Sequence, residues 1–198
     1  MARESEFTPP RPWCPEPELW EAHDADSTER EVTELVAAFV RAIKPQFVLE
    51  TGTSYGYTAE AIGRALIANG RGRLVTLEKD AALAAIARER CLGLPVEVLE
   101  CDSATWTPEA GESIDFAWLD SDIIGRVHEL KRLWKCFSSG AIVGIHDTGP
   151  QHPVHDVLQK HSLPWPRIRL RTPRGVTFFE MPSTTPKHSA EAPGLGDR

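Results

Sequence analysis

The sequence of 198 residues lacks the patterns that mark several large protein classes. Its four cysteines form no C-x-x-C pair and show no zinc-ligand spacing, so we expect neither a disulfide framework nor a zinc module. No apolar run approaches the roughly 18 residues of a membrane-spanning helix, and the first residues contain no apolar segment of signal-peptide length. These absences predict a chain that does not span a membrane and that works in the reducing cytoplasm.

Positive charge is also scarce. The chain has 22 Lys and Arg against 29 Asp and Glu, for a formal net charge of −7. General nucleic-acid binders carry a basic surface, so nucleic acid is not an expected partner. One basic stretch stands out near the C-terminus, where Arg167, Arg169, Arg171 and Arg174 cluster and the first three alternate with Ile168 and Leu170. A solvated face of one strand is the plain interpretation, and a surface for an anionic acceptor or a partner is the alternative.

A dinucleotide fingerprint is missing from the most informative loop of the chain, residues 50–56. This loop joins the apolar run 47–49 to a helix-patterned segment. The pattern G-x-G-x-x-G starting at Gly52 would need glycine at the positions of Ser54 and Tyr57. We therefore expect no pyrophosphate site. Glu50 would repel a phosphate and attract a ligand with an amino group, and S-adenosylmethionine carries both an ammonium and a sulfonium group.

Apolar runs of strand length alternate with helix-patterned segments through most of the chain. Strands are expected near 47–51, 73–78, 95–101, 114–119, 141–146, 167–171 and 175–181, and helices near 56–69, 80–92, 126–137 and 153–161. A further helix precedes them, with Thr28 as its N-cap and Glu31 completing a capping box. The alternation predicts an α/β fold with a parallel sheet covered by helices on both faces. Ligands of such sheets bind at the carboxyl ends of the strands.

The loop 50–56 resembles the first motif of the class I S-adenosylmethionine-dependent methyltransferases. Glu78, which ends the second apolar run, matches the family acid that takes both ribose hydroxyls, and Asp102 after the third run matches the residue that contacts adenine. The resemblance implies a three-layer Rossmann-like fold, with a mostly parallel seven-stranded sheet and an antiparallel C-terminal strand. It also implies that S-adenosylmethionine is held by Glu50, Thr51, Gly52, Thr53, Ser54, Tyr55, Gly56, Glu78, Lys79, Asp102, Ser103 and Asp120.

The end of the fourth apolar run resembles one branch of that family, the catechol and caffeoyl-CoA O-methyltransferases. Asp120-Ser121-Asp122 matches their D-x-D, and His146-Asp147 stands where they carry Asp-Asn or Glu-Asp. By this resemblance Asp120, His146 and Asp147 would hold Mg²⁺ or another divalent metal, which would lower the pKa of a bound acceptor hydroxyl. Alternatively, His146 and Asp147 hydrogen-bond to loops or to each other while Asp120 faces the cofactor.

The chain departs from this branch at Ile123, where the relatives carry Lys or His as the catalytic base. His146 is the first candidate to replace it and is assigned with Asp120 to catalysis, because its ordinary pKa lies near neutrality. His152 and His155 are further candidates, and their plain interpretation is that of exposed histidines around a helix start.

The resemblance implies a methyltransferase that acts on an oxygen of a small-molecule acceptor. Two alternatives remain: a non-catalytic binder of S-adenosylmethionine or S-adenosylhomocysteine that acts through partners, and a dinucleotide-dependent oxidoreductase of the same fold. The sequence does not name the acceptor, and it leaves a homodimer open.

Three parts are expected along the chain. Residues 1–26 form an arm rich in proline and acids, and its Trp13, Trp20 and His23 are expected to pack on the domain or to line the acceptor pocket. Residues 27–181 form a single methyltransferase-like domain. Residues 182–198, rich in Ser, Thr, Pro and Gly, form a flexible tail.

Overall fold

A computed structural model of the protein describes residues 14–24, 27–160 and 163–182. Trp13 and residues 183–198 of the predicted tail therefore lie outside the described residues, and the division into arm, domain and tail stays a prediction. The elements are η1 (Pro17–Leu19), α1 (Arg30–Ile43), β1 (Phe47–Thr51), α2 (Tyr57–Asn69), β2 (Arg73–Glu78), α3 (Ala81–Arg90), β3 (Val96–Glu100), β4 (Ile114–Leu119), α4 (Gly125–Leu133), η2 (Trp134–Cys136), β5 (Phe137–His146), α5 (Pro153–Lys160), β6 (Arg167–Leu170) and β7 (Val176–Glu180).

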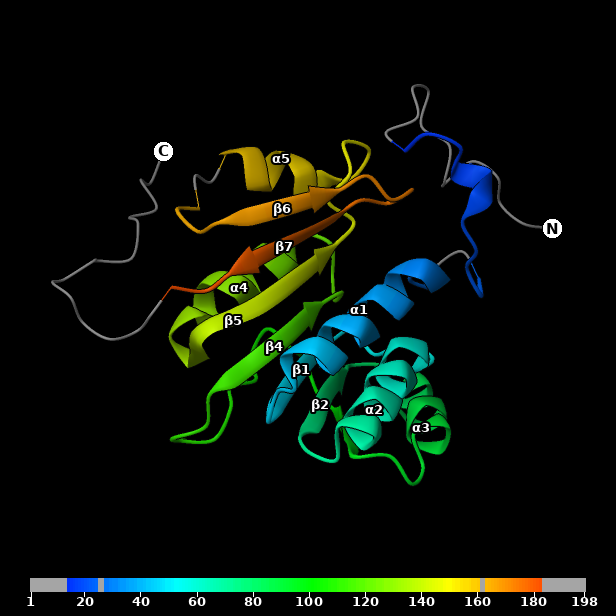
Figure 1. Ribbon diagram of the computed structural model, residues 1–198, viewed down its shortest axis with the longest axis vertical. Helices are drawn as coiled ribbons and strands as arrows, with labels where there is room; N and C mark the ends of the chain where they lie inside the picture. The colour runs from blue at the N-terminus through cyan, green and yellow to red at the C-terminus, as the bar shows by residue number, and fades with distance from the viewer. Residues whose placement is uncertain (1–13, 25–26, 161–162, 183–198) are drawn as a thin grey trace, which may run out of the picture.

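The strands form one seven-stranded sheet in the order β3-β2-β1-β4-β5-β7-β6 (Figure 1). Neighbours among the first five strands are parallel, whereas β7 runs antiparallel to both β5 and β6. This confirms the predicted fold, including the antiparallel C-terminal strand. The chain winds outward in one direction from β1 to β3 and in the other from β4, so the carboxyl ends of β1 and β4 flank the switch point where such sheets bind ligands.

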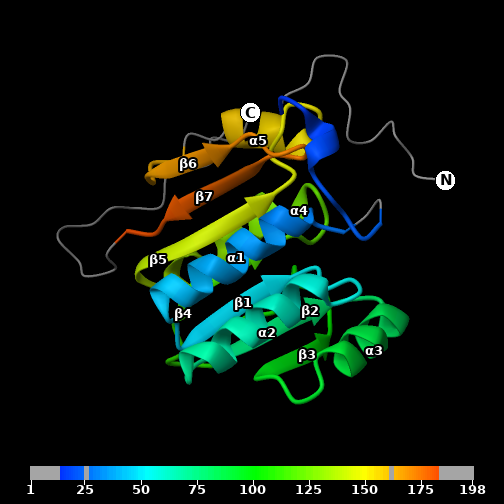
Figure 2. The same ribbon diagram turned by 45° about the vertical axis from the view of Figure 1, so that its right-hand side comes forward.

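Helices α1 and α2 cover one face of the sheet (Figure 2). In α1 the buried side chains Val32, Val36 and Val40 recur every four residues, which aligns them on one stripe. They belong to a buried cluster with Phe116 and Trp118 of β4. The regular stripe therefore fixes which side of α1 faces the sheet.

Helices α4 and α5 cover the opposite face. Val127 and Leu130 of α4 and Leu158 of α5 are buried in a second cluster, which includes Leu119 of β4 and Ile145 of β5. Adjacent residues of β4, Trp118 and Leu119, thus contribute to opposite clusters, as the two-residue repeat of a strand requires. The sheet is buried on both faces, which explains the almost continuous apolar runs of its central strands.

The strand predicted near 141–146 begins earlier than expected, at Phe137. Phe137 pairs with Ile114 of β4, and the pairing register then shifts before Phe116. Gly140 lies within this irregular stretch with φ +75°, a backbone conformation that favours glycine. The expected helix 126–137 correspondingly ends at Leu133, because η2 and the start of β5 take its last residues.

The capping box predicted at Thr28 was wrong. Helix α1 begins at Arg30 with Glu29 as the N-cap residue, and no side chain caps it. The Thr28 hydroxyl instead donates a hydrogen bond to Asp120 Oδ2 at 2.7 Å, and Glu31 Oε2 accepts one from the Glu21 amide. The start of α1 is therefore shaped by contacts to the site and to the N-terminal segment.

The described part of the N-terminal segment lies on the side toward which the parallel strands point (Figure 1). Trp20 packs against the cluster formed by α1 and α2. The ring of His23 stacks on that of Tyr57 with their centroids 3.8 Å apart. Both contacts agree with the expected packing of this segment on the domain.

Candidate functional site

The loop after β1 turns sharply at Gly52 and touches the end of β4. Gly52 has φ +79°, and a Cβ atom added there would lie 2.2 Å from the carbonyl oxygen of Asp120. Its amide donates to the Leu77 carbonyl of β2 at 2.9 Å, while the Asp120 amide donates to the Thr51 carbonyl. These contacts bring the glycine motif and the D-x-D, 68 positions apart in the chain, to one place.

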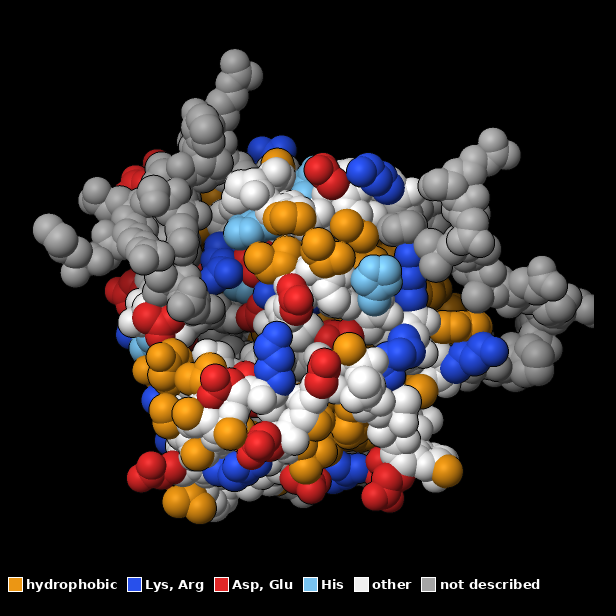
Figure 3. All heavy atoms as spheres, turned by 180° about the vertical axis from the view of Figure 1, so that it is seen from behind, with side chains coloured by type: hydrophobic (Ala, Val, Ile, Leu, Met, Phe, Trp, Pro, Cys, Tyr) orange, Lys and Arg blue, Asp and Glu red, His pale blue; other side chains and the backbone are white. Residues whose placement is uncertain are grey.

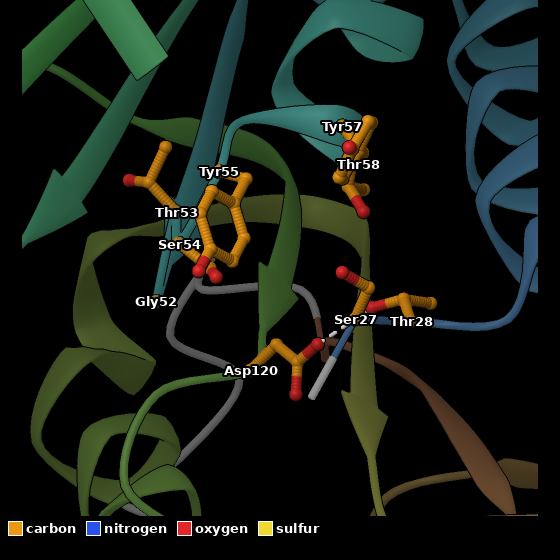
Figure 4. Close-up of a pocket in the computed structure, with 9 residues that line it drawn as sticks. All are labelled: Ser27, Thr28, Gly52, Thr53, Ser54, Tyr55, Tyr57, Thr58 and Asp120. Atoms are coloured by element: carbon orange, nitrogen blue, oxygen red, sulfur yellow. Dashed lines mark hydrogen bonds between the residues drawn. The ribbon is translucent and has the colours of Figure 1, made fainter. Parts of the chain in front are cut away.

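Two pockets open at this place and share Gly52, Ser54 and Asp120. The smaller has a volume of about 50 Å³ and is lined by Ser27, Thr28, Gly52, Thr53, Ser54, Tyr55, Tyr57, Thr58 and Asp120 (Figure 4). The larger has a volume of about 480 Å³ and is lined by Gly52, Ser54, Leu77, Glu78, Lys79, Cys101, Asp102, Ser103, Asp120, Ser121, Asp122 and Ile123. A ligand with two polar ends joined by a short linker would fill both and pass the three shared residues.

Nine of the twelve predicted cofactor residues line one or both of these pockets. They are Gly52, Thr53, Ser54, Tyr55, Glu78, Lys79, Asp102, Ser103 and Asp120. Glu50, Thr51 and Gly56 line neither, because Glu50 and Thr51 lie in the buried strand β1 and Gly56 is the N-cap of α2. Their assignment to cofactor binding stays a prediction, and the structure gives them supporting positions behind the loop.

Glu78 connects the larger pocket to the loop. Its Oε2 accepts a hydrogen bond from the Ser54 amide at 2.8 Å and its Oε1 accepts one from the Asp80 amide at 2.9 Å. Glu78 is 8% exposed and lines the larger pocket, and its carboxylate has further lone pairs beyond these two hydrogen bonds. This arrangement is suited to accepting hydrogen bonds from a diol.

Glu50 is sealed beneath the loop at 1% exposure. Burial raises its pKa to about 8 from an ordinary 4.5; the hydrogen bond from the Thr76 hydroxyl opposes this rise, whereas the nearby Asp120 and Glu78 carboxylates add to it. Thr76 also shares a hydrogen bond with Thr53, which lines the smaller pocket. The protonation state of Glu50 is thereby linked to the pocket wall.

We expect Glu50 to weaken the fold as the pH rises from about 4.5 to about 8. In this window the unfolded chain releases the proton that the folded chain retains. The contribution of Glu50 to stability is therefore fully present below pH 4.5 and is lost as the pH rises to about 8. Glu50→Gln removes the titration. Urea titrations across the window should show the stability of the wild type falling by a few kcal/mol relative to Glu50→Gln, at about 1.4 kcal/mol per pKa unit. Parallel curves would show that Glu50 does not titrate there.

Glu129 was not predicted as a site residue. This buried carboxylate of α4 accepts hydrogen bonds from the hydroxyls of Thr51, Ser103 and Ser121, which follow or end three different strands. It therefore holds the floor of the larger pocket together. The sequence offered no signal for it, because a glutamate within an amphipathic helix is ordinarily exposed to solvent.

His146 lies at the end of β5 and is wholly buried between two carboxylates. Its Nε2 is 2.7 Å from Glu29 Oε2, and its Nδ1 is 3.1 Å from Asp120 Oδ1. Burial alone would lower the pKa of His146, but Asp120, Asp147 and Glu29 raise it to about 10. His146 lines neither pocket, and this imidazolium has no free nitrogen to accept a proton.

Asp147 is held by two arginines, Arg126, which was not predicted, and Arg174, which was noted only as part of the basic stretch near the C-terminus. Arg126 Nη1 and Arg174 Nη2 both donate to its Oδ2, the latter at 3.0 Å. Burial would raise the pKa of Asp147, yet His146 and the guanidinium groups of Arg126 and Arg174 hold it far below its ordinary range. Arg126 also pairs with Asp120 at 2.9 Å.

Three further residues bear on the identity of the catalytic base, namely Ile123, His152 and His155. Ile123 does line the larger pocket, where relatives would present a base. His152 Nε2 lies 3.6 Å from Asp147 Oδ1, and burial lowers the pKa of His152. His155 Nδ1 is 3.1 Å from the Thr148 carbonyl. Neither histidine lines the two pockets, so their catalytic role stays a prediction.

Two further observations concern the charge of the surface and the length of the helices. On the face shown in Figure 3, Lys and Arg side chains are interspersed with Asp and Glu. Among the described residues, no helix is both long and apolar enough to cross a membrane.

Comparison with known proteins agrees with this site. A family model described as a methyltransferase domain matches residues 49–148, half of the chain and the whole stretch from the Gly52 loop to the His146-Asp147 pair. No curated protein sequence matches significantly.

Several solved structures share the fold at low sequence identity. The O-methyltransferase TomG from Streptomyces achromogenes, in complex with SAM, is 22% identical with a TM-score of 0.64, covering 80% of this chain and 82% of its own. The SAH-bound methyltransferase PaMTH1 from Podospora anserina is 18% identical with a TM-score of 0.68, covering 79% and 80%. The O-methyltransferase from Bacillus cereus, in complex with SAH, is 19% identical with a TM-score of 0.64, covering 79% and 83%. The likeness shows the fold, and the family match shows that this chain belongs to the methyltransferase domain family.

Proposed function

We propose that the protein transfers the methyl group of S-adenosylmethionine to an oxygen of a small-molecule acceptor. The observation that carries the proposal is the pair of neighbouring pockets at the switch point of the sheet, which share three lining residues. The larger pocket, with Glu78 and Asp102 on its wall, suits the adenosine half, and the smaller one, bounded by the hydroxyl groups of Thr28, Thr53 and Thr58, suits the amino-acid half. Two of the fold neighbours are O-methyltransferases with SAM or SAH bound, which favours oxygen as the acceptor atom.

In this arrangement the sulfonium group lies near the three residues that both pockets share. An acceptor oxygen donates an electron pair to the methyl carbon, and the carbon–sulfur bond breaks with its pair remaining on sulfur. The products are the methylated acceptor, S-adenosylhomocysteine and one proton. The protein contributes mainly by aligning oxygen, carbon and sulfur.

Asp120 is the residue that we assign to direct contact with the reacting groups, because it lines both pockets. Burial would raise the pKa of Asp120, but His146 and Arg126 keep it below its ordinary value. Such a carboxylate is a weak base, so acceptors with acidic hydroxyls are favoured. His146 acts on Asp120 and is a positioning residue in this proposal.

Calorimetric titration with S-adenosylmethionine and S-adenosylhomocysteine, with NAD as the control, tests the cofactor. We expect both sulfur ligands to bind and NAD to fail, because the loop lacks the glycines of a pyrophosphate site. Binding of NAD alone would favour an oxidoreductase and contradict the proposal.

Glu78→Gln is expected to weaken binding of both sulfur ligands by about tenfold or more, since one carboxylate oxygen and a negative charge are lost. Glu100→Gln is the matched control, because Glu100 pairs with Glu78 in the sheet register, is exposed and lines neither pocket. Equal losses of affinity in the two variants would mean that the ribose of the cofactor does not bind at Glu78.

A non-catalytic binder remains the second candidate, favoured by Ile123 at the place of the relatives' base. Turnover distinguishes the two functions. Protein incubated with methyl-labelled S-adenosylmethionine and a panel of phenols and carboxylic acids should give labelled product. Tight cofactor binding without transfer to any member of a broad panel would support the binder.

A further inference from the structure

The family resemblance implies a divalent metal at Asp120, His146 and Asp147. One ligand atom from each lies within 4.8 Å of the others, so the three side chains do come together. A metal also requires that each of these atoms direct a free lone pair at a common point. The contacts of all three side chains can be tested against that requirement.

Both carboxylate oxygens of Asp147 already accept hydrogen bonds from guanidinium groups. Arg174 Nε donates to Oδ1, and Arg126 Nη1 and Arg174 Nη2 donate to Oδ2. The Asp147 side chain is wholly buried, and that of Arg126 is only 5% exposed. Ligation by Asp147 would compete with the pairs that it forms with Arg126 and with Arg174, and this competition is unfavourable at a buried site.

Neither ring nitrogen of His146 is free to bind a metal. Carboxylates accept but do not donate, and each ring nitrogen of His146 faces one, Glu29 at 2.7 Å and Asp120 at 3.1 Å. Both ring nitrogens are therefore already engaged by carboxylates. A metal could bind His146 only by displacing one of these contacts.

The charges of the cluster are already balanced. Three carboxylates, those of Glu29, Asp120 and Asp147, face three cationic side chains, those of His146, Arg126 and Arg174. A divalent ion would add two uncompensated positive charges to a buried site. Asp120 too is engaged through both oxygens, by Arg126 and His146 on Oδ1 and by Thr28 on Oδ2.

We propose that Arg126 and Arg174 take the place of the divalent metal, and that this methyltransferase works without one. The two arginines supply fixed positive charge behind Asp147, and Arg126 together with His146 holds Asp120 where the pockets meet. The acceptor is then oriented by the pocket walls alone. Only the activity part of this inference rests on the proposed function.

Titration of the wild-type protein with Mn²⁺, followed by electron paramagnetic resonance and calorimetry, tests the proposal without S-adenosylmethionine or acceptor. We expect no specific binding at millimolar Mn²⁺ and no change in Tm with Mn²⁺ or Mg²⁺. Once an acceptor is known, activity should be unchanged in EDTA. Stoichiometric Mn²⁺ binding that is lost in Asp147→Asn would overturn the proposal, whatever the protein methylates.

A gain-of-binding variant tests the role of the guanidinium groups. The double variant Arg126→Met/Arg174→Met frees both oxygens of Asp147 and leaves the cluster negative, so it should bind Mn²⁺ about tenfold or more tightly than the wild type. Arg167→Met/Arg169→Met, on the edge strand β6, is the matched control and should behave as the wild type. A folded double variant with wild-type Mn²⁺ affinity would overturn the claim. If the double variant does not fold, the wild-type titration decides.

Discussion

Gly52→Ala is expected to abolish cofactor binding. The new methyl group would lie 2.2 Å from the Asp120 carbonyl oxygen and 2.8 Å from Ser121 Cα, both backbone atoms that cannot rotate away. The loop after β1 must therefore move away from the end of β4, which separates the walls of both pockets. A misplacement of about 1 Å can cost about 100-fold in the rate of catalysis, and a loop that has moved away from β4 also loses its contacts to the cofactor. We expect at least that loss in affinity for S-adenosylmethionine, measured by calorimetry.

Gly93→Ala separates the steric effect from backbone strain. Gly93 has φ +78°, almost the value of Gly52, and a Cβ atom there would meet nothing within 4 Å. Both variants should lose about 1 to 2 kcal/mol of stability from the left-handed backbone. Gly93→Ala should keep the wild-type affinity for the cofactor. Similar affinities for the two variants would mean that the contact between loop and strand does not shape the site.

Arg126→Met should be the most destabilising single change in the ion cluster, which consists of Glu29, Asp120, Arg126, His146, Asp147 and Arg174. It leaves Asp120 and Asp147 with an uncompensated negative charge in a site where Arg126 is only 4% exposed. Removing one member of a buried ion pair costs about 3 to 5 kcal/mol, because the partner stays buried without compensation. Unfolding in urea, followed by circular dichroism, measures this loss. Arg64→Met, at an exposed pair with Glu60, should change stability by less than about 1 kcal/mol.

Adding Asp147→Asn to Arg126→Met should recover part of the lost stability. Asparagine tolerates the left-handed backbone at this position, where φ is +58°, and it removes the unpaired charge. The double variant is therefore expected to be more stable than the sum of the two single changes predicts. Strict additivity would show that Arg126 and Asp147 are not coupled, despite their contact.

The fold was readable from the sequence because its signals are local. Runs such as 47–49 and 114–119 are apolar on both faces, as strands of a covered parallel sheet must be, and they alternate regularly with helical segments. The strand ends then placed Gly52, Glu78, Asp102 and Asp120 at one edge, and the structure brings them together around two pockets. Each of these predictions needed only the chain direction and the side-chain periodicity.

The ion cluster could not be read in the same way. Glu29 stands before a helix, Arg126 within one and Arg174 in a turn, and residues of these types at such positions are usually exposed. Glu29 meets His146 and the Arg174 amide across 117 and 145 positions of the chain, and Arg126 and Arg174 reach Asp147 across 21 and 27. The wrong prediction of Thr28 as an N-cap has the same kind of cause. Its hydroxyl could cap a helix, but it donates a hydrogen bond to the distant Asp120 instead.

The link between Glu29 and the turn at Arg174 has a consequence for synthesis of the chain. Glu29 Oε1 accepts a hydrogen bond from the Arg174 amide, and its Oε2 contacts His146. The earliest and the latest parts of the domain to leave a ribosome thus meet in one cluster. A growing chain that ends between Asp147 and Arg174 exposes the Gly52 loop but lacks Arg174, one of the two guanidinium groups that neutralise Asp147. The finished site is therefore expected only after residue 174 has emerged, so an incomplete chain would not compete for the cofactor.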